Sequence, residues 1–214
     1  MKRGPSFLRD NALTLAFLGL LLLALIGQLI SGLAEFNASQ LANGGDQVSW
    51  VGYLTSSSFA VDVAENWQSE YLQFFMYIVA TTWLIQVGSS ESKKPDDVGT
   101  QSDQAQQVGA FAGKGSPRWA KAGGWRTAVY GRSLASVMLF FFLGSLLAQS
   151  VAGRAAYNHD QLAQFEDPVS WTGYVASADF WNRTFQNWQS EFLAVASMAI
   201  FAIYGKDLPD TAQL

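Results

Sequence analysis

The chain has 214 residues and a formal net charge of −4, and half of its residues are hydrophobic while only 14% are charged. Soluble domains carry about a quarter charged residues, so this composition is typical of a membrane protein. The lack of a basic stripe between aromatic residues argues against nucleic acid as a partner. The lack of cysteine excludes disulfides, thiolate zinc sites and cysteine nucleophiles.

The first expected element is an apolar helix over Asn11–Leu33. No charged residue occurs between Asp10 and Glu35, and about 20 apolar residues suffice to cross a bilayer as a helix. Three basic residues precede this stretch: Lys2, Arg3 and Arg9. A secretory signal has similar features. We reject that interpretation because the stretch is long for a signal and because a matching segment recurs in mid-chain.

The second expected element is a helix that runs into a second span over Trp67–Val87. Ser56 is its expected N-cap, because the residues after it continue without Gly or Pro into the apolar stretch. The preceding segment, Ala34–Asn66, contains four acidic residues and no Lys or Arg. It is therefore expected on the outer side of the membrane.

The third expected element is a connector over residues 88–123. Its first part is rich in Ser, Gln, Asp, Gly and Lys, so we predict that it is largely disordered. Basic residues gather between the second and third spans: Lys93, Lys94, Lys114, Arg118, Lys121 and Arg126. The positive-inside rule assigns this connector, and with it both termini, to the cytoplasm.

The last expected elements are spans over Ser133–Gly153 and Phe185–Tyr204. The first of these is free of charged residues, whereas only 14 charge-free residues separate Glu191 from Lys206. Those residues would form about 21 Å of helix, short of the hydrocarbon thickness of about 30 Å. The fourth span is therefore expected to begin near Phe185, which places Glu191 inside the helix close to its outer boundary.

The two halves of the sequence match each other without gaps. Gln28 matches Gln149, 121 positions later, and the same spacing aligns Asn66-Trp67-Gln68-Ser69-Glu70 with Asn187-Trp188-Gln189-Ser190-Glu191. Further matches are Gly32 with Gly153, Asn37 with Asn158, Val48-Ser49-Trp50 with Val169-Ser170-Trp171, and Phe59 with Phe180. Chance similarity of apolar segments would not match Asn, Gln, Trp and Glu, so the sequence indicates an internal repeat.

These elements predict an all-α polytopic membrane protein with four transmembrane helices. The helices form two tandem hairpin repeats that point the same way, because each repeat crosses the membrane an even number of times. The predicted organisation is a first repeat over residues 1–87, a cytoplasmic linker over 88–123 and a second repeat over 124–214.

A candidate polar cluster comes from the matched segment: Asn66, Gln68, Glu70, Asn187, Gln189 and Glu191. A carboxylate inside a membrane helix costs upward of about 2.5 kcal/mol at mid-membrane and usually faces protein or water. In one interpretation, a pseudo-twofold axis brings the six together to bind a cation or relay a proton. In the other, which we prefer, Glu70 and Glu191 are boundary carboxylates stabilised by the helix dipole.

Four tryptophans recur in pairs: Trp50, Trp67, Trp171 and Trp188. Tryptophan gathers at bilayer boundaries, so an interfacial belt is expected, with a ligand-stacking platform as the alternative. Gln28 and Gln149 are expected to form interhelical hydrogen bonds, and Asn37 and Asn158 to be capping or turn residues.

His159 is the only histidine, and we expect it to be a solvated loop residue. No catalytic motif, metal site or cofactor motif is recognisable.

Four segments carry a resemblance to a known family. They are residues 65–73, residues 187–193, Ser-Pro-Arg-Trp-Ala-Lys-Ala-Gly-Gly-Trp-Arg at 116–126 and Asp-Pro-Val-Ser-Trp at 167–171. The chain resembles, almost end to end, a family of uncharacterised bacterial membrane proteins known only as a domain of unknown function. The resemblance implies a bacterial source and a membrane setting, and it transfers no activity, substrate or catalytic residue.

The leading functional hypothesis is a non-enzymatic accessory, scaffold or interaction subunit of the bacterial inner membrane. Its expected partners are the lipid bilayer and another membrane protein or further copies of the chain. The alternative is a small cation- or proton-coupled transporter or channel that uses Glu70 and Glu191. A pigment- or lipid-binding protein is a third possibility, suggested by aromatic richness alone.

Overall fold

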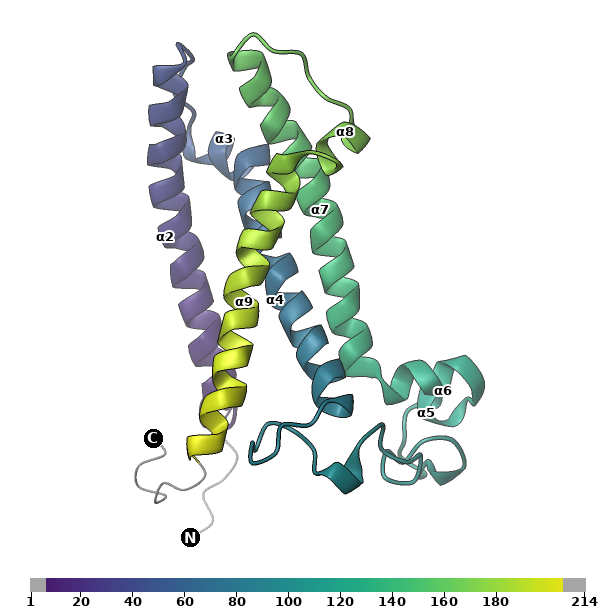
Figure 1. The fold of residues 1–214 in the computed structure, drawn as a ribbon. Coiled ribbons are helices and arrows are strands. Elements are labelled where there is room, and N and C mark those ends of the chain that lie inside the picture. Colours follow the sequence, from purple (N-terminus) through teal and green to yellow (C-terminus); the bar gives the residue numbers. More distant parts are fainter. Residues whose placement is uncertain (1–6, 206–214) are drawn as a thin grey trace.

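The fold is taken from a computed structural model that describes residues 7–205. Four long helices run along the molecule (Figure 1): α2 (Ala12–Ala42), α4 (Ser57–Trp83), α7 (Ser133–Ala163) and α9 (Ala178–Gly205). The short elements are α1 (Phe7–Asp10), α3 (Trp50–Leu54), η1 (Pro95–Asp97), η2 (Gly109–Phe111), α5 (Arg118–Lys121), α6 (Gly124–Gly131) and α8 (Trp171–Val175). No strand occurs in the part of the chain that the structure describes, so the all-α prediction is confirmed.

Two of the long helices, α2 and α7, are long and apolar enough to cross a membrane. Each has 31 residues, which at about 1.5 Å per residue gives about 46 Å, more than a bilayer's hydrocarbon thickness of about 30 Å. Both continue well past Leu33 and Gly153, where the predicted spans end, because no Gly or Pro interrupts Ala34–Ala42 or Arg154–Ala163. We call the end where they finish, which also holds α3 and α8, the distal end.

Helix α4 ends earlier than the sequence predicts. The prediction continued to Val87, but the helix stops at Trp83 and residues 84–87 leave the helical path. The Ser92 hydroxyl accepts a hydrogen bond from the Gln86 backbone N–H at 3.0 Å and donates one to the Gln86 carbonyl at 3.0 Å. Gly88 then turns the chain with a φ of +90°. These side-chain bonds replace the helical ones, a competition that apolar content does not reveal.

Two of the long helices, α4 and α9, begin directly after a serine whose hydroxyl caps the helix. Ser56 accepts a hydrogen bond from the Phe59 backbone N–H at 3.2 Å, and Ser177 accepts one from Phe180 at 3.2 Å. These bonds satisfy backbone donors that have no partner within the first turn of a helix. The capping role predicted for Ser56 is therefore confirmed.

The two hairpins, α2–α4 and α7–α9, point the same way (Figure 1). The start of α1, the end of α9 and the segment between α4 and α7 all lie at the end opposite α3 and α8. This segment contains η1, η2, α5 and α6, and it buries Val108 and Ala120. The disorder predicted for residues 88–123 stays a prediction. Lys2, Arg3 and Lys206, used in the sequence argument, lie outside the described residues.

Helix α4 packs chiefly along α7, and α9 crosses α4. Each short distal helix joins the two long helices of its own hairpin, since α3 contacts α2 and α4 while α8 contacts α7 and α9. Helix α2 is the least covered of the four, because Leu33 is its only buried residue. The packing therefore centres on α4, with α2 at the edge.

One tyrosine from each of the short distal helices, α3 and α8, packs against a glycine of a long helix. Tyr53 lies on Gly32 of α2 and Tyr174 lies on Gly153 of α7, and both rings are almost fully buried. A Cβ added at either glycine would lie 2.9 Å from the Cζ atom of the facing ring. Glycine is required because only a bare backbone admits the ring this closely.

A second contact at the distal end also occurs once in each half of the chain, at positions 121 residues apart. The Asn37 side chain accepts a hydrogen bond from the Val48 N–H at 2.8 Å and donates one to the Val48 carbonyl at 3.1 Å. Asn158 bonds Val169 in the same way, at 2.8 and 3.0 Å. Both asparagines lie inside helices and clamp the returning loop, so the turn position expected for them is wrong, whereas the expected capping contact with a loop is present.

Gly32→Ala and Gly153→Ala should each destabilise the protein by about 1–3 kcal/mol, because the added methyl group overlaps the tyrosine ring. Gly19→Ala is the matched control in α2, since nothing lies within 4 Å of its added Cβ. It should be neutral or stabilise by up to about 1 kcal/mol through helix propensity. Thermal unfolding in detergent, followed by tryptophan fluorescence, measures all three. Equal midpoints for Gly32→Ala and Gly19→Ala would contradict the close packing.

Candidate functional site

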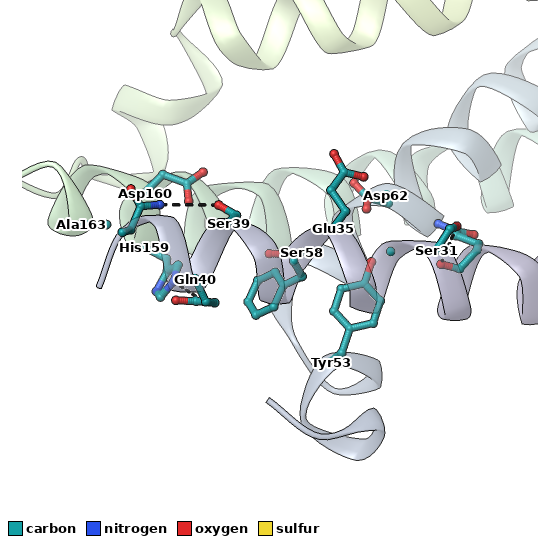
Figure 2. A pocket seen from close by; sticks show the side chains of 14 residues that line it. Ser31, Glu35, Ser39, Gln40, Tyr53, Ser58, Asp62, His159, Asp160 and Ala163 are labelled. Atoms are coloured by element: carbon teal, nitrogen blue, oxygen red, sulfur yellow. Dashed lines mark hydrogen bonds between the residues drawn. The ribbon is translucent and has the colours of Figure 1, made fainter. Parts of the chain in front are cut away.

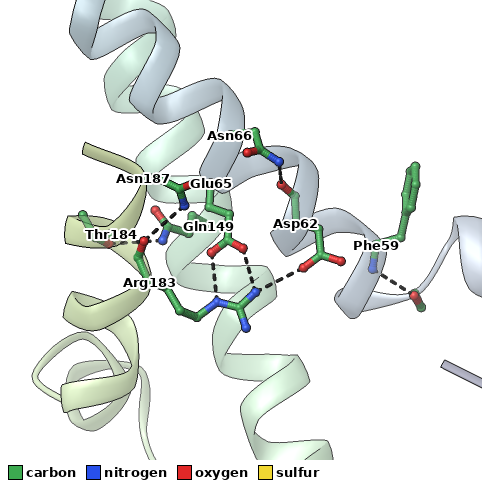
Figure 3. Close-up of polar contacts among 9 residues, drawn as sticks. Phe59, Asp62, Glu65, Asn66, Gln149, Arg183, Thr184 and Asn187 are labelled. Atoms are coloured by element: carbon green, nitrogen blue, oxygen red, sulfur yellow. Dashed lines mark hydrogen bonds and ion pairs between the residues drawn. The ribbon is translucent and has the colours of Figure 1, made fainter. Parts of the chain in front are cut away.

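Arg183 of α9 forms ion pairs with two carboxylates of α4 at the distal end (Figure 3). Its Nε and Nη2 atoms donate to the two Glu65 carboxylate oxygens at 2.9 and 2.7 Å, and Nη2 also donates to Asp62 at 3.1 Å. The Glu65 side chain is 12% exposed, whereas those of Arg183 and Asp62 are 36% and 39% exposed. A bidentate guanidinium–carboxylate pair is directional as well as strong, so it fixes how α9 crosses α4.

Sequence reasoning missed this ion pair, although the sequence contains a signal for it. Asp62 and Arg183 stand 121 positions apart, so they are equivalent in the two halves but opposite in charge. Glu65 is matched by Gln186, which removes a carboxylate near Arg183 in the second half. Charge reversal at matched positions indicates that the two positions meet.

Burial and neighbouring charge act in opposite directions on Asp62. Burial raises the pKa of Asp62, and the Glu65 carboxylate adds to that increase, while Arg183 lowers it. The hydrogen bond to Glu65 raises the pKa of Arg183, so the guanidinium stays charged. The net result is a pKa of Asp62 above its ordinary value.

Two fully buried glutamines lie next to the ion pair, one on α4 and one on α7. Gln68 accepts a hydrogen bond from the Trp188 indole at 2.9 Å, and Gln149 donates one to the Thr184 hydroxyl at 3.2 Å. The Gln149 bond joins α7 to α9, which confirms the interhelical role predicted for Gln149. The Gln68 Nε2 and Gln149 Oε1 atoms have no hydrogen-bond partner among the described residues.

A polar cleft of about 430 Å³ opens beside α2 and includes Asp62 (Figure 2). Its lining contains Glu35, Asp160, His159 and Gln28. The His159 Nε2 atom lies 2.9 Å from Gln40 Nε2, and its ring stacks on Phe36 with centroids 6.4 Å apart. His159 is thus inside α7 and tied to α2, which corrects the loop position expected for it.

These observations describe a distal polar site that combines an open cleft with an ion pair behind it. A model of the family described as "Domain of unknown function (DUF6766)" matches residues 4–207. The chain belongs to this family. No curated protein and no solved structure matches the chain.

The six candidate cluster residues of this DUF6766 chain lie in different surroundings. Asn66 and Asn187 each bond a carbonyl of their own helix, those of Asp62 and Arg183. Gln68 is buried, whereas Gln189 and Glu70 are exposed. Glu191 is half-buried, and its backbone carbonyl accepts a hydrogen bond from Gln73, three residues after Glu70, at 3.4 Å. The structure thus brings the two carboxylates near each other and leaves Asn66, Asn187 and Gln189 outside a shared polar contact.

The four tryptophans also differ. Trp50, Trp67 and Trp171 are 51%, 44% and 44% exposed, and Trp188 is half-buried on Gln68. The Trp171 indole donates to the Ser150 hydroxyl at 3.1 Å. The exposed rings suit a bilayer boundary, while Trp188 contributes to helix packing. The interfacial belt itself stays a prediction.

Arg183→Gln should destabilise the DUF6766 chain, by about 1–3 kcal/mol after allowance for partial exposure, because it leaves Glu65 unpaired. It also removes the one group that lowers the pKa of Asp62. A raised folded-state pKa stabilises below the ordinary pKa of about 4, and that stability is lost as pH rises. Loss of stability should therefore be small near pH 4 and largest near neutrality.

Thermal midpoints between about pH 4 and pH 8 measure this effect, since that window brackets the titration of a carboxyl with a raised pKa. Arg154→Gln is the control, because Arg154 is an exposed distal arginine that bonds only the Val169 carbonyl, at 3.1 Å. Its pH profile should run parallel to that of the unmodified protein. A parallel profile for Arg183→Gln would show that the ion pair does not control Asp62.

Proposed function

We propose that the chain is a multi-pass protein of the bacterial inner membrane with four spans in two copies of one helical hairpin. The apolar lengths of α2 and α7 support membrane insertion. The parallel direction of the hairpins and the recurrence of the Tyr–Gly and Asn–Val contacts support the duplication. Helices α4 and α9 would then also cross the membrane, because each is the second, returning helix of its hairpin. Basic residues between α4 and α7 put both termini in the cytoplasm.

Single cysteines test this topology, because the chain contains none. Asp46→Cys at the distal end and Lys114→Cys between α4 and α7 both replace exposed residues. In intact spheroplasts, a membrane-impermeant maleimide should label Asp46→Cys, and Lys114→Cys should react only after permeabilisation. Labelling of both positions from the same side would exclude the proposed arrangement.

The function that we propose is that of a non-enzymatic accessory, scaffold or interaction subunit. The observation that carries it is the exposure of α2, whose apolar stretch has no buried residue before Leu33. Distal contacts to Tyr53, Val48 and His159 hold α2 in place. A rigidly held helix with an open face is suited to contact another membrane helix.

Native mass spectrometry from a mild detergent, with ion flux in liposomes, tests this function. We expect a particle that contains more than one polypeptide and no flux above that of empty liposomes. A lone monomer that carries ions would exclude the proposal.

The position of Glu70 and Glu191 on adjacent helices, which meet where Gln73 bonds the Glu191 carbonyl at 3.4 Å, favours a second candidate, a cation- or proton-coupled transporter. If it holds, Glu70→Gln combined with Glu191→Gln should abolish flux, because neutral amides bind a cation poorly and cannot relay protons. Glu166→Gln is the control, since it removes an exposed distal carboxylate elsewhere. Equal flux in the unmodified protein, the double variant and Glu166→Gln would exclude this candidate.

A further inference from the structure

The contact between α4 and α7 has a matching pair of faces that do not meet within the chain. At a spacing of 121 residues, positions of α4 correspond to positions of α9, and positions of α2 correspond to positions of α7. Helix α4 packs extensively along α7. Within residues 7–205, no comparable contact joins α9 to α2.

The face of α9 that corresponds to the buried face of α4 is open. Helix α4 buries Val61, Ala64, Gln68 and Ser69. The equivalent residues of α9, all exposed, are Asn182, Phe185, Gln189 and Ser190. A face that is buried in one half of the chain is thus unoccupied in the other.

The corresponding face of α2 is open except at Gly32, which Tyr53 of the same chain covers. Helix α7 buries Ser145, Gln149, Ser150 and Gly153. The equivalent residues of α2, none of them buried, are Ala24, Gln28, Leu29 and Gly32. Both faces carry small residues and a glutamine, the side chains that let membrane helices approach closely and form hydrogen bonds with one another.

One pair of side chains shows how the open faces would fit. Tyr71 of α4 stacks on Phe141 of α7 with ring centroids 4.9 Å apart. The equivalent residues are Phe192 of α9, which is 43% exposed, and Leu20 of α2, which is 60% exposed. Both are large and apolar and keep exposed surface, although Phe192 also borders a groove with Met76 and Tyr77 of α4.

The bond between the indole of Trp188 and Gln68 gives a second pair. The residues equivalent to Trp188 and Gln68 are Trp67 of α4, which is 44% exposed, and Gln189 of α9, which is also exposed. Both side chains keep exposed surface, although Trp67 also borders the groove between α4 and α7.

We propose that α9 of one copy of this chain packs against α2 of a second copy, in the way that α4 packs against α7 within one chain. The distal contacts of α2 point to a second copy as the occupant. Tyr53, the Asn37 clamp and the Gln40–His159 contact hold the distal part of α2. Helix α2 lies at the edge of the molecule (Figure 1), and it makes no extensive contact with α9 among the described residues. The inference rests on the proposed interaction function and names its partner.

This contact joins two different surfaces, so it is a head-to-tail interface. Such an interface closes into a ring when the rotation from one unit to the next divides a full turn. In two chains joined this way at both ends, four hairpins would surround an axis along the membrane normal. Each Trp67 would then reach Gln189 of the neighbouring copy, as Trp188 reaches Gln68 within the chain.

Cysteine cross-linking between two differently tagged copies tests the proposal on the full-length chain. One copy carries Leu20→Cys and the other carries Phe192→Cys, both at exposed sites in a protein without native cysteine. The copies are co-expressed, and membranes are treated with a short bifunctional maleimide. Leu22→Cys replaces Leu20→Cys in the control, because Leu22 is 59% exposed but lies on the opposite side of α2.

We expect a mixed dimer from Leu20→Cys with Phe192→Cys, in at least tenfold excess over the control pair. Neither variant expressed alone should give a comparable dimer, because a head-to-tail interface does not place identical residues together.

A strong dimer from Leu20→Cys alone would overturn the proposal in favour of a symmetric contact. A chain with both substitutions that cross-links only within itself would overturn it as well, by showing that α9 closes on its own α2.

No cross-link, in a protein that still purifies with a different polypeptide, would remove the second copy as partner and leave the proposed function in place. A lone monomer that carries ions would remove both.

Discussion

The packing of α4 along α7 holds the two halves of the chain together, and every other feature of the fold is arranged around it. Tyr71 stacks on Phe141, and small residues such as Ala64 and Ser145 line the groove between the two helices. If α4 crosses the membrane beside α7, as we propose, close approach of small residues replaces the hydrophobic effect as the source of attraction. Because α9 then crosses α4, the position of Arg183 depends on this first contact.

The sequence was sufficient to predict the elements and insufficient to predict their partners. Ser56 was recognisable as a cap because capping needs only local residue types. The end of α4 was not, because Ser92, six residues away, takes over the backbone bonds of Gln86. The clamp formed by Asn37 likewise needs a loop that returns along its own helix, a long-range feature that local pattern does not contain.

In the candidate site, too, the sequence was sufficient to predict some residues and insufficient to predict all of their contacts. Matching the two halves singled out Gln68 and Trp188, and they do bond each other. The same alignment pairs Asp62 with Arg183, a reversal of charge that a comparison of identical residues does not reveal. Differences between matched positions were more informative than identities here, because an ion pair between equivalent positions requires that they differ.

That reversal also separates the contact within a chain from contacts between chains. If both positions held aspartate, the two α4-like helices would repel each other at the distal end, and neither half would prefer the other. Arginine at position 183 gives the second half an attractive surface for Asp62 and Glu65 of the first. The orientation of α9 on α4 is thereby specified by charge, whereas the residues that form the open faces of α2 and α9 are uncharged. Specificity within the chain is thus electrostatic, and the open faces rely on shape and amide hydrogen bonds, which suits them to a partner met within the bilayer.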